Sequence, residues 1–206
     1  MLYRLVCAVT YLFSRIAFRM RYEGLENIPQ EGGFILSSNH QSNFDPVFLA
    51  HKVKQPLRFL GKEELFKNKF FAWVLTQLGA FPIARGTGDM DALATATEIV
   101  RQGSALVIFP EGTRSKSGKP LRARSGVAYV AGRANVGILP CSIDYKGKLA
   151  FRREITLRFH PILPVEELQI DVENPRTLRT ASRKVMDVIC SGLTWKGPYA
   201  LQEGTE

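Results

Sequence analysis

Short apolar runs alternate with segments of helical periodicity along most of this chain, and this alternation limits the folds open to it. Apolar runs of this length are typical of buried strands. They lie at residues 33–38, 57–60, 79–83, 104–109, 137–143 and 154–159. Residues 89–101 repeat apolar side chains at helical spacing. Asp45-Pro46 and Asn174-Pro175 each supply an N-cap followed by a first-turn proline.

The alternation predicts an α/β fold with a largely parallel central sheet flanked by helices. Residues 25–206 suffice for a single domain with a full core, and they contain no repeat, low-complexity tract or long linker. Ligands of such sheets bind beyond the carboxyl ends of the strands. We therefore expect one α/β domain over 25–206, with its chemistry in the segments that follow the strands.

The first segment, residues 1–24, has a different pattern. Its apolar stretch at 2–21 is interrupted by four arginines, so no uncharged run reaches the ~20 residues that a membrane span needs. On a helix, Arg4, Arg15 and Arg19 fall in one sector of roughly 60°, and the aliphatic residues fall in another of roughly 120°. We predict an amphipathic helix that lies in the headgroup plane of a membrane. A helix packed on its own domain has the same periodicity and remains an alternative.

The composition favours anionic partners. Lysine and arginine number 28 against 19 aspartate and glutamate, a net charge of +9 that suits nucleic acid, anionic lipid, a phosphorylated substrate or an acidic carrier protein. Nucleic acid is not expected, because the chain has no zinc-ligand spacing, RNP-like block or basic recognition helix. The three histidines lack a compact ligand spacing, so no metal site is expected. Cys7, Cys141 and Cys190 are scattered, which fits a reducing compartment.

A histidine and an aspartate follow the first strand of the domain. His40 comes directly after the strand at 33–38, and Asp45 begins the next helix. Across a strand-to-helix turn the carboxylate can reach the imidazole, fix its tautomer and leave the other ring nitrogen free to accept a proton from an alcohol. His40 and Asp45 are therefore candidates for a general base and its orienting carboxylate. A loop histidine followed by a helix-capping aspartate is the more common meaning of the bare spacing.

A second loop offers groups suited to an anion. After the strand at 104–109, residues 112–115 combine a glycine that admits close backbone approach with threonine, arginine and serine donors for a phosphate. Arg85 follows another strand and is a further candidate. Each arginine by itself is more commonly a solvated surface residue. In a parallel sheet, however, His40, Arg85 and Arg114 lie at the same edge.

With these motifs in this order, the chain resembles the 1-acylglycerol-3-phosphate acyltransferases, the lysophosphatidate acyltransferases of the glycerolipid acyltransferase superfamily. Gly137 and Asn68-Lys69 stand where many relatives have proline, which leaves donor preference open. The first and third of four blocks are specific, and the second and fourth are loose. The blocks cover residues 34–143 as NHQSNFD at 39–45, GKEELF at 61–66 with GAFPIAR at 79–85, FPEGTRS at 109–115 and VGILPCS at 136–142.

The resemblance implies a role for each block. His40 is implied to act as general base on the acceptor hydroxyl, with Asp45 behind it. No cofactor or metal is implied, because the acyl chain comes from a thioester co-substrate, either acyl-CoA or acyl carrier protein. The residues implied for the acceptor phosphate are Arg85, Glu111, Gly112, Thr113 and Arg114, and those implied for the acyl-donor side are Ile138, Leu139 and Pro140.

The implied reaction transfers an acyl chain to the sn-2 hydroxyl of lysophosphatidate, which gives phosphatidate for phospholipid biosynthesis. An alternative is a related acyltransferase with the same base and a different acceptor, namely glycerol 3-phosphate, another lysophospholipid or another lipid alcohol. A non-catalytic basic protein that binds membranes or nucleic acid is the alternative of a different class.

The implied partners are an anionic membrane surface, lysophosphatidate and the thioester, without nucleic acid. We expect a peripheral or monotopic membrane protein on the cytoplasmic face, with 1–24 as its interfacial segment and 25–206 as its acyltransferase domain. Lysines interleaved with aromatic residues at 66–73 are a second candidate for membrane contact, and a packed helix fits them as well.

Overall fold

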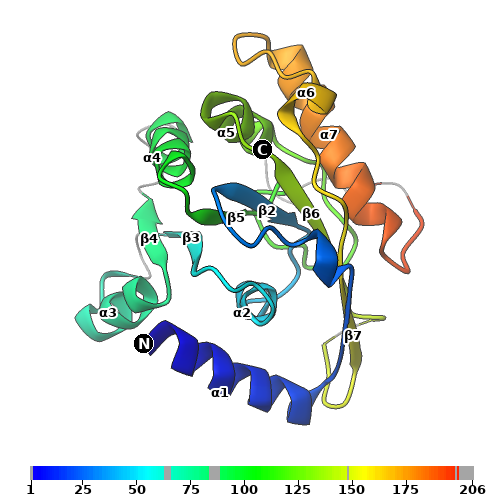
Figure 1. Ribbon diagram of the computed structural model, residues 1–206. Coiled ribbons are helices and arrows are strands. Elements are labelled where there is room, and N and C mark those ends of the chain that lie inside the picture. Colours follow the sequence, from blue (N-terminus) through cyan, green and yellow to red (C-terminus); the bar gives the residue numbers. More distant parts are fainter. Residues whose placement is uncertain (1, 63–65, 84–88, 148, 198, 200–206) are drawn as a thin grey trace.

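The computed structural model describes residues 2–62, 66–83, 89–147, 149–197 and 199, and its centre is a twisted sheet with helices on both faces (Figure 1). The sheet has seven strands in the order β1-β7-β6-β2-β5-β3-β4. Neighbouring strands are parallel except β6 and β7, which are antiparallel. The predicted α/β fold with a largely parallel sheet is confirmed. The strands are β1 (Arg19–Glu23), β2 (Phe34–Ser38), β3 (Leu57–Lys62), β4 (Ala80–Ile83), β5 (Ala105–Ile108), β6 (Ile138–Asp144) and β7 (Glu154–Phe159).

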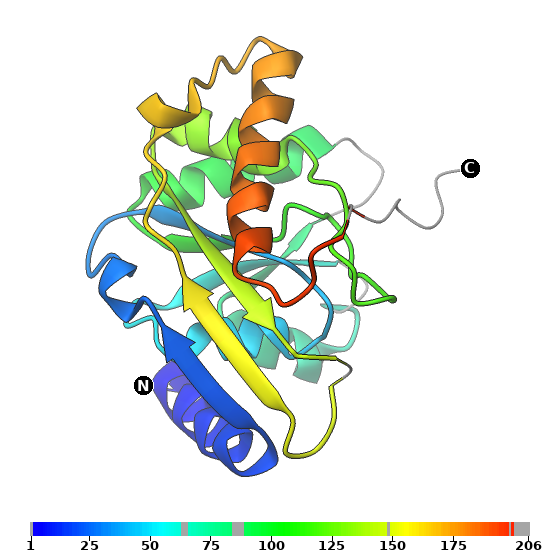
Figure 2. The same ribbon diagram turned by 90° about the vertical axis from the view of Figure 1, so that its right-hand side faces the viewer.

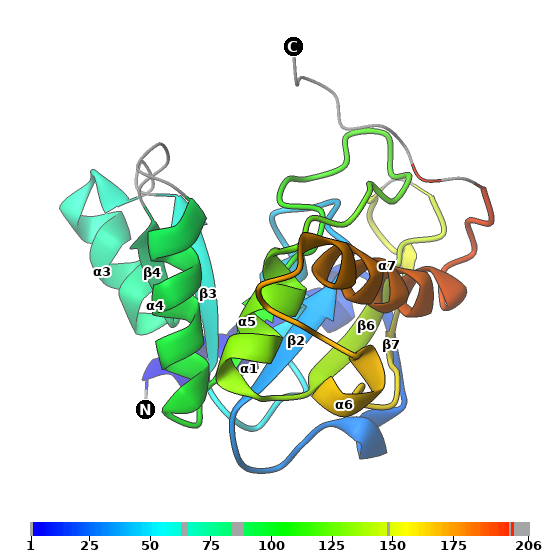
Figure 3. The same cartoon turned by 90° about the horizontal axis from the view of Figure 1, so that it is seen from above.

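The helices divide between the two faces of the sheet. One face is covered by α1 and α2, and the other by α4, α5 and α7, which lie side by side when the molecule is seen from above (Figure 3). The helices are α1 (Leu2–Ala17), α2 (Asp45–Ala50), α3 (Lys69–Gln77), α4 (Asp89–Arg101), α5 (Gly126–Ala134), α6 (Val165–Leu168) and α7 (Pro175–Ser191), with a 3-10 turn, η1 (Leu25–Asn27).

The central strand β2 is buried along its whole length. Because successive side chains of a strand point to opposite faces, Leu36 enters the core on the α1–α2 side and Ile35 the core on the α4–α5–α7 side. Both side chains are fully buried. A strand covered on both faces reads as a continuous apolar run, which is why the sequence displayed β2 clearly. Its carboxyl end delivers His40 to one edge of the sheet.

The helix predicted over 2–21 ends earlier than expected. α1 stops at Ala17, and residues 19–23 form β1, which pairs in parallel with β7. In β1 the buried Met20 lies between exposed Arg19 and Arg21. Two arginines spaced by two residues share one face of a strand, so they fit a strand as well as an amphipathic helix. Of the helices in the part of the chain that the structure describes, none is long and apolar enough to cross a membrane.

The sequence analysis did not predict α5 and α6, and it gave a helix in the region of α3 only as an alternative. α5 contains Gly126 and Gly132, which weaken helix propensity. A Cβ at Gly132 would meet the side chain of Ile170 at 2.5 Å, so the small residue is required by close packing. α6 is a single short turn. α3 forms within the basic aromatic stretch, where Trp73 is largely exposed.

Candidate active site

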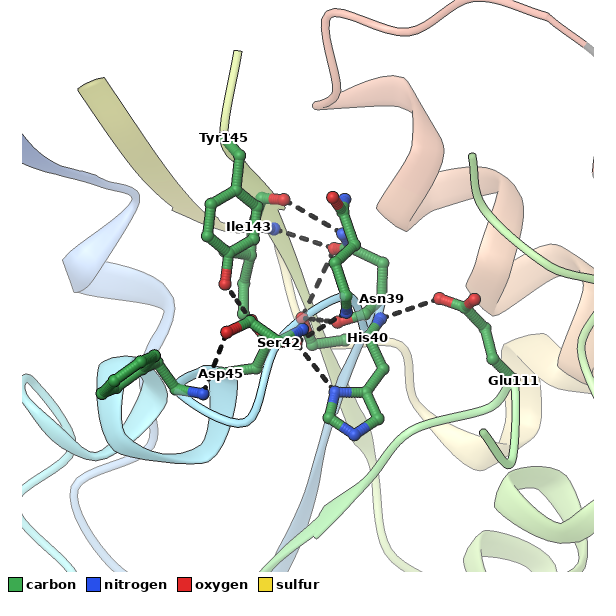
Figure 4. Close-up of polar contacts among 10 residues, drawn as sticks. Asn39, His40, Ser42, Asp45, Glu111, Ile143 and Tyr145 are labelled. Atoms are coloured by element: carbon green, nitrogen blue, oxygen red, sulfur yellow. Dashed lines mark hydrogen bonds and ion pairs between the residues drawn. The ribbon is translucent and has the colours of Figure 1, made fainter. Parts of the chain in front are cut away.

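Three segments meet at the carboxyl edge of the sheet, where each follows a neighbouring parallel strand. His40 lies beyond β2, residues 109–124 lie beyond β5, and Tyr145 lies directly beyond β6. The pairing of β2 with both β5 and β6 brings these three segments into contact. Figure 4 shows the polar contacts that result.

The pair of His40 and Asp45 is assembled as the turn geometry predicts. His40 Nδ1 lies 2.7 Å from Asp45 Oδ2. The aspartate side chain is fully buried, whereas 17% of the histidine side chain is exposed. Because an ionised carboxylate can only accept, Nδ1 carries the proton and donates it. Nε2 therefore holds a lone pair that can accept a proton from a substrate.

The Asp45 carboxylate accepts hydrogen bonds from further donors, two in its own turn and one beyond β6. The backbone N–H groups of Gln41 and Ser42 donate to Oδ2 at 2.7 and 2.8 Å. The hydroxyl of Tyr145 donates to the other oxygen, Oδ1. Burying a carboxylate is costly unless such bonds replace its hydration. The turn between β2 and α2 is thus folded around the carboxylate (Figure 4).

Asn39 fixes the chain directly before the histidine. Its side-chain Nδ2 donates to the carbonyl of Ile143 at 3.0 Å, and its Oδ1 accepts from the Ile143 N–H at 2.8 Å. The amide therefore continues the β2–β6 pairing beyond the last residue of β2. Asn39 is almost fully buried, so this bridge sets the direction in which His40 leaves the sheet.

The buried side chain of Glu111 joins His40 to the loop over residues 111–124. Its Oε1 accepts from the His40 N–H at 2.8 Å and its Oε2 from the Leu121 N–H at 3.0 Å. The loop is also bound directly, since the Ser115 N–H donates to the His40 carbonyl at 2.8 Å. Burial raises the pKa of Glu111 to about 8. The two backbone donors lower this pKa and the nearby negative charge of Asp45 raises it, but burial has the largest effect. This buried carboxyl contacts the two backbone amides, and the contact with the acceptor phosphate that the resemblance implies stays a prediction.

The remaining predicted phosphate residues of this loop, Gly112, Thr113 and Arg114, are exposed beside the histidine. Gly112 has φ +69°, a backbone conformation that favours glycine, and a Cβ there would come within 2.9 Å of Arg124. The positive φ accounts for the glycine at this position, and the approach of a ligand to its backbone stays a prediction. Arg85 lies outside the described residues.

Phe109 was missed by the sequence prediction. Its ring stacks on the imidazole of His40, with ring centroids 3.9 Å apart and planes 13° from parallel. This contact restricts rotation of the imidazole about its side-chain bonds. The aromatic residue directly before Pro110-Glu111 was the available signal.

The residues predicted for the acyl-donor side are not brought to the histidine. Ile138 and Leu139 are fully buried and pack in the cores on opposite faces of the sheet. Pro140 is also buried. Ile138 pairs with Ile35 near the start of β2, at the opposite end from His40. The apolar run at 137–143 is that of a strand covered on both faces, and the link of these residues with the acyl donor stays a prediction.

The other two histidines have structural contacts. His51 Nδ1 lies 3.0 Å from the Tyr22 hydroxyl, and His160 Nε2 lies 2.7 Å from the Ser142 hydroxyl. The described part of the chain holds no group of three or more His, Cys, Asp or Glu side chains that could bind a metal ion.

Comparison with known proteins shows the family to which the chain belongs. The family model described as Acyltransferase matches residues 19–144. A chloroplastic 1-acyl-sn-glycerol-3-phosphate acyltransferase of Arabidopsis thaliana is 29% identical over 135 residues, which are 64% of this chain and 38% of that protein. A 1-acyl-sn-glycerol-3-phosphate acyltransferase of Streptococcus pneumoniae is 27% identical over 185 residues, which are 86% of this chain and 67% of that protein. This chain thus spans less than half the length of its chloroplast relative.

A solved structure has the same fold. The crystal structure of the 1-acyl-sn-glycerophosphate acyltransferase PlsC from Thermotoga maritima matches with a TM-score of 0.65 and 28% identity. The match covers 84% of this chain and 70% of that one.

The pH dependence of stability tests the position of Glu111. Its pKa is raised from 4.5 to about 8 in the folded protein, so between these values the folded state binds more protons than the unfolded state. The contribution of Glu111 to stability then falls as the pH rises through this window. Glu111→Gln cannot titrate, and the melting temperature of the parent relative to this variant should decrease from about pH 5 to about pH 8.

The control for this measurement is Glu26→Gln, which alters an exposed carboxylate on η1. Its melting temperature should follow that of the parent across the same range. A difference between the parent and Glu111→Gln that stays constant with pH would contradict the burial of a proton-binding carboxyl group at this position.

Proposed function

Because this chain belongs to the acyltransferase family, we propose that it transfers an acyl chain from a thioester to the sn-2 hydroxyl of lysophosphatidate, which gives phosphatidate. The observation that carries the proposal is the His40–Asp45 pair, which leaves a basic imidazole nitrogen at the edge of the sheet. The names of the relatives support the choice of acceptor.

In the proposed reaction His40 Nε2 takes the proton of the acceptor hydroxyl, and the oxygen attacks the thioester carbonyl. The tetrahedral oxyanion then collapses, the carbon–sulfur bond breaks, and the leaving thiolate receives the proton from His40. Asp45 holds the Nδ1–H and stabilises the transient imidazolium. A thioester is already activated, so positioning and one base suffice without a cofactor or a metal.

The cysteines support direct transfer, without an acyl-enzyme intermediate. Burial raises the pKa of the Cys190 thiol to about 12 and that of the Cys141 thiol well above its ordinary value. Burial also raises the pKa of Cys7. Since the thiolate is the nucleophilic form, these thiols are poor acyl acceptors at neutral pH.

The loop over residues 111–124 supplies the charge for an anionic acceptor. Its one acidic residue, Glu111, is buried, while its five basic residues are all exposed. We assign the acceptor phosphate to the exposed Arg114, Thr113 and the backbone at Gly112, and we keep Arg85, which the family resemblance implies, as a further candidate. Guanidinium groups suit this task because they make paired, charge-assisted hydrogen bonds to phosphate. The exposed basic residues are Arg114, Lys116, Lys119, Arg122 and Arg124.

We place the membrane on the outer face of α1. Five large apolar side chains of this helix are each more than half exposed, and they form one stripe. The loop between β6 and β7 continues the surface, because the Arg152 N–H donates to the Ala17 carbonyl at 2.6 Å, and Figure 2 shows this loop beside the end of α1. Phe151 in this loop is 75% exposed and lies next to Arg152 and Arg153. The stripe consists of Leu5, Val9, Leu12, Phe13 and Ile16.

Apolar side chains flanked by arginines suit the headgroup region of an anionic bilayer. This arrangement favours membrane seating over burial of α1 on its own domain, because the opposite face of α1 already packs on the protein through the buried Ser14 and Ala17.

The decisive experiment is acyl transfer by purified protein in detergent, with palmitoyl-CoA and palmitoyl-acyl carrier protein as alternative donors and lysophosphatidate as acceptor. The parent should form phosphatidate and release thiol. His40→Ala should reduce turnover at least ~100-fold, because it removes the base, while the melting temperature changes little. His51→Gln, which alters the histidine at the other end of α2, bonded to Tyr22 and not to Asp45, should keep parental turnover.

Turnover by His40→Ala within a factor of ten of the parent would contradict the mechanism. If product forms only with glycerol 3-phosphate or another lyso-lipid, the assignment of His40 as base stands and the assignment of lysophosphatidate as acceptor is wrong. Transfer from only one of the two thioesters would identify the donor.

Arg114→Ala tests the phosphate assignment. A charge-assisted hydrogen bond contributes about 1.5–3 kcal/mol, so the KM for lysophosphatidate should rise about 10- to 150-fold while kcat stays nearly constant. Arg179→Ala, on the exposed face of α7, is the control and should leave both constants unchanged. A parental KM in Arg114→Ala would move the phosphate site to other residues.

The membrane assignment is tested by the double variant Leu12→Ser/Phe13→Ser, measured by sedimentation with vesicles that contain anionic phospholipid. Loss of two large apolar contacts should weaken binding at least ~10-fold. Turnover of a soluble short-chain acceptor should be retained. Met90→Ser replaces an equally exposed apolar residue on α4 and should bind vesicles as the parent does. Equal vesicle binding by the parent and the double variant would rule out this surface.

A further inference from the structure

We propose that Tyr145 is a positioning residue of the reaction, which holds the Asp45 carboxylate in the plane that His40 requires. This inference rests on the proposed function, since it assigns a task within the same site. Tyr145 lies outside the four sequence blocks, directly after the last residue of β6. Its hydroxyl donates to Asp45 Oδ1 (Figure 4).

The two oxygens of Asp45 are held from different parts of the chain. Oδ2 accepts from His40 Nδ1 and from the N–H groups of Gln41 and Ser42, all of which belong to the turn after β2. Oδ1 accepts from Tyr145, which is separated from Asp45 by 100 positions. Rotation of the carboxylate about its Cβ–Cγ bond moves both oxygens, so the donors on Oδ2 and the hydroxyl on Oδ1 resist it from opposite sides. Tyr145 therefore adds a support from the sheet to the orientation of the group that orients the base.

The tyrosine itself is held firmly. It is 3% exposed, and its ring packs at a tilt against Phe48 of α2, with centroids 6.4 Å apart. Two residues earlier in the chain, Ile143 makes both hydrogen bonds to Asn39. The hydroxyl is thus attached to a strand of the sheet, which is a more rigid support than the turn that carries Asp45.

The chemistry of the phenol suits a permanent donor. Burial, together with the negative charge of Asp45, raises the pKa of Tyr145 far above its ordinary value. The hydroxyl therefore keeps its proton at neutral pH and well above it. It can neither replace His40 as a base nor compete for the substrate proton, so its action passes through Asp45.

Tyr145→Phe removes the hydroxyl and keeps the ring. We expect kcat to fall about tenfold, as for loss of one hydrogen bond to a charged group, while the KM values for lysophosphatidate and for the thioester stay within twofold. Tyr22→Phe is the matched control. It removes the hydroxyl of another tyrosine beside the same core, bonded to His51 at 3.0 Å. Both variants should lose similar thermal stability, but only Tyr145→Phe should lose kcat.

A double-mutant cycle separates positioning from general damage. In the Asp45→Asn background, Tyr145→Phe should cause no further loss of kcat, because its effect is transmitted by the carboxylate. Replacement of Tyr145 by 3-fluorotyrosine keeps the ring and the donor and should restore kcat, and it serves also if Tyr145→Phe is too unstable to assay. The proposal is overturned by parental kcat in Tyr145→Phe, by an equal loss in Tyr22→Phe, or by the same tenfold loss in the Asp45→Asn background.

A readout without turnover keeps this inference distinct from the proposed function. The Nδ1–H proton of His40, bonded to Asp45, should give a downfield proton resonance that is absent in His40→Ala. It should broaden or move upfield in Tyr145→Phe and stay in place in Tyr22→Phe. If the parent does not acylate lysophosphatidate, the assignment of the acceptor fails and this resonance still decides on Tyr145. An unchanged resonance in Tyr145→Phe would refute the positioning role.

Discussion

The carboxylate of Asp45 has no access to solvent, and a buried carboxylate must be given hydrogen-bond donors. Two come from the backbone of the turn after β2, one from the imidazole of His40 and one from Tyr145 beyond β6. The backbone donors depend on the local turn, the imidazole on the position of His40, and the tyrosine on the pairing of β2 with β6. The need to satisfy this one group therefore couples the geometry of the base to the central sheet.

A second buried carboxyl group repeats this arrangement one loop away. Glu111 accepts from the N–H groups of His40 and Leu121, so the base and the basic loop are tied to the same side chain. The acidic groups of this edge lie inside, whereas its arginines and lysines lie outside. The exposed surface of this edge is therefore basic, because the carboxyl groups are buried beneath it. A basic edge of this kind suits the phosphorylated acceptor that we propose, and it lies adjacent to His40, the proposed base.

The sequence revealed those features whose cause is local. Buried strands such as β2 read as short apolar runs, and the turn between His40 and Asp45 is closed by residues within a few positions of each other. The boundary between α1 and β1 was hidden because arginines at 19 and 21 suit both periodicities. α5 was hidden because it contains two glycines, of which Gly132 is set by tertiary packing on Ile170 and Val172. Tyr145 left no local signal, since its partner lies 100 positions earlier.

The same physical reasoning connects the base to the proposed membrane face. The segment that begins with Tyr145, bonded to Asp45, reaches Arg152, which donates to the last residue of α1. The helix on which we place the membrane and the carboxylate that orients His40 are thus joined through one short connection between β6 and β7. An amphiphilic acceptor holds its free hydroxyl at the depth of its headgroup. A base fixed relative to α1 is then fixed relative to that depth, so membrane seating would bring the hydroxyl to His40 without lifting the acyl chain out of the bilayer.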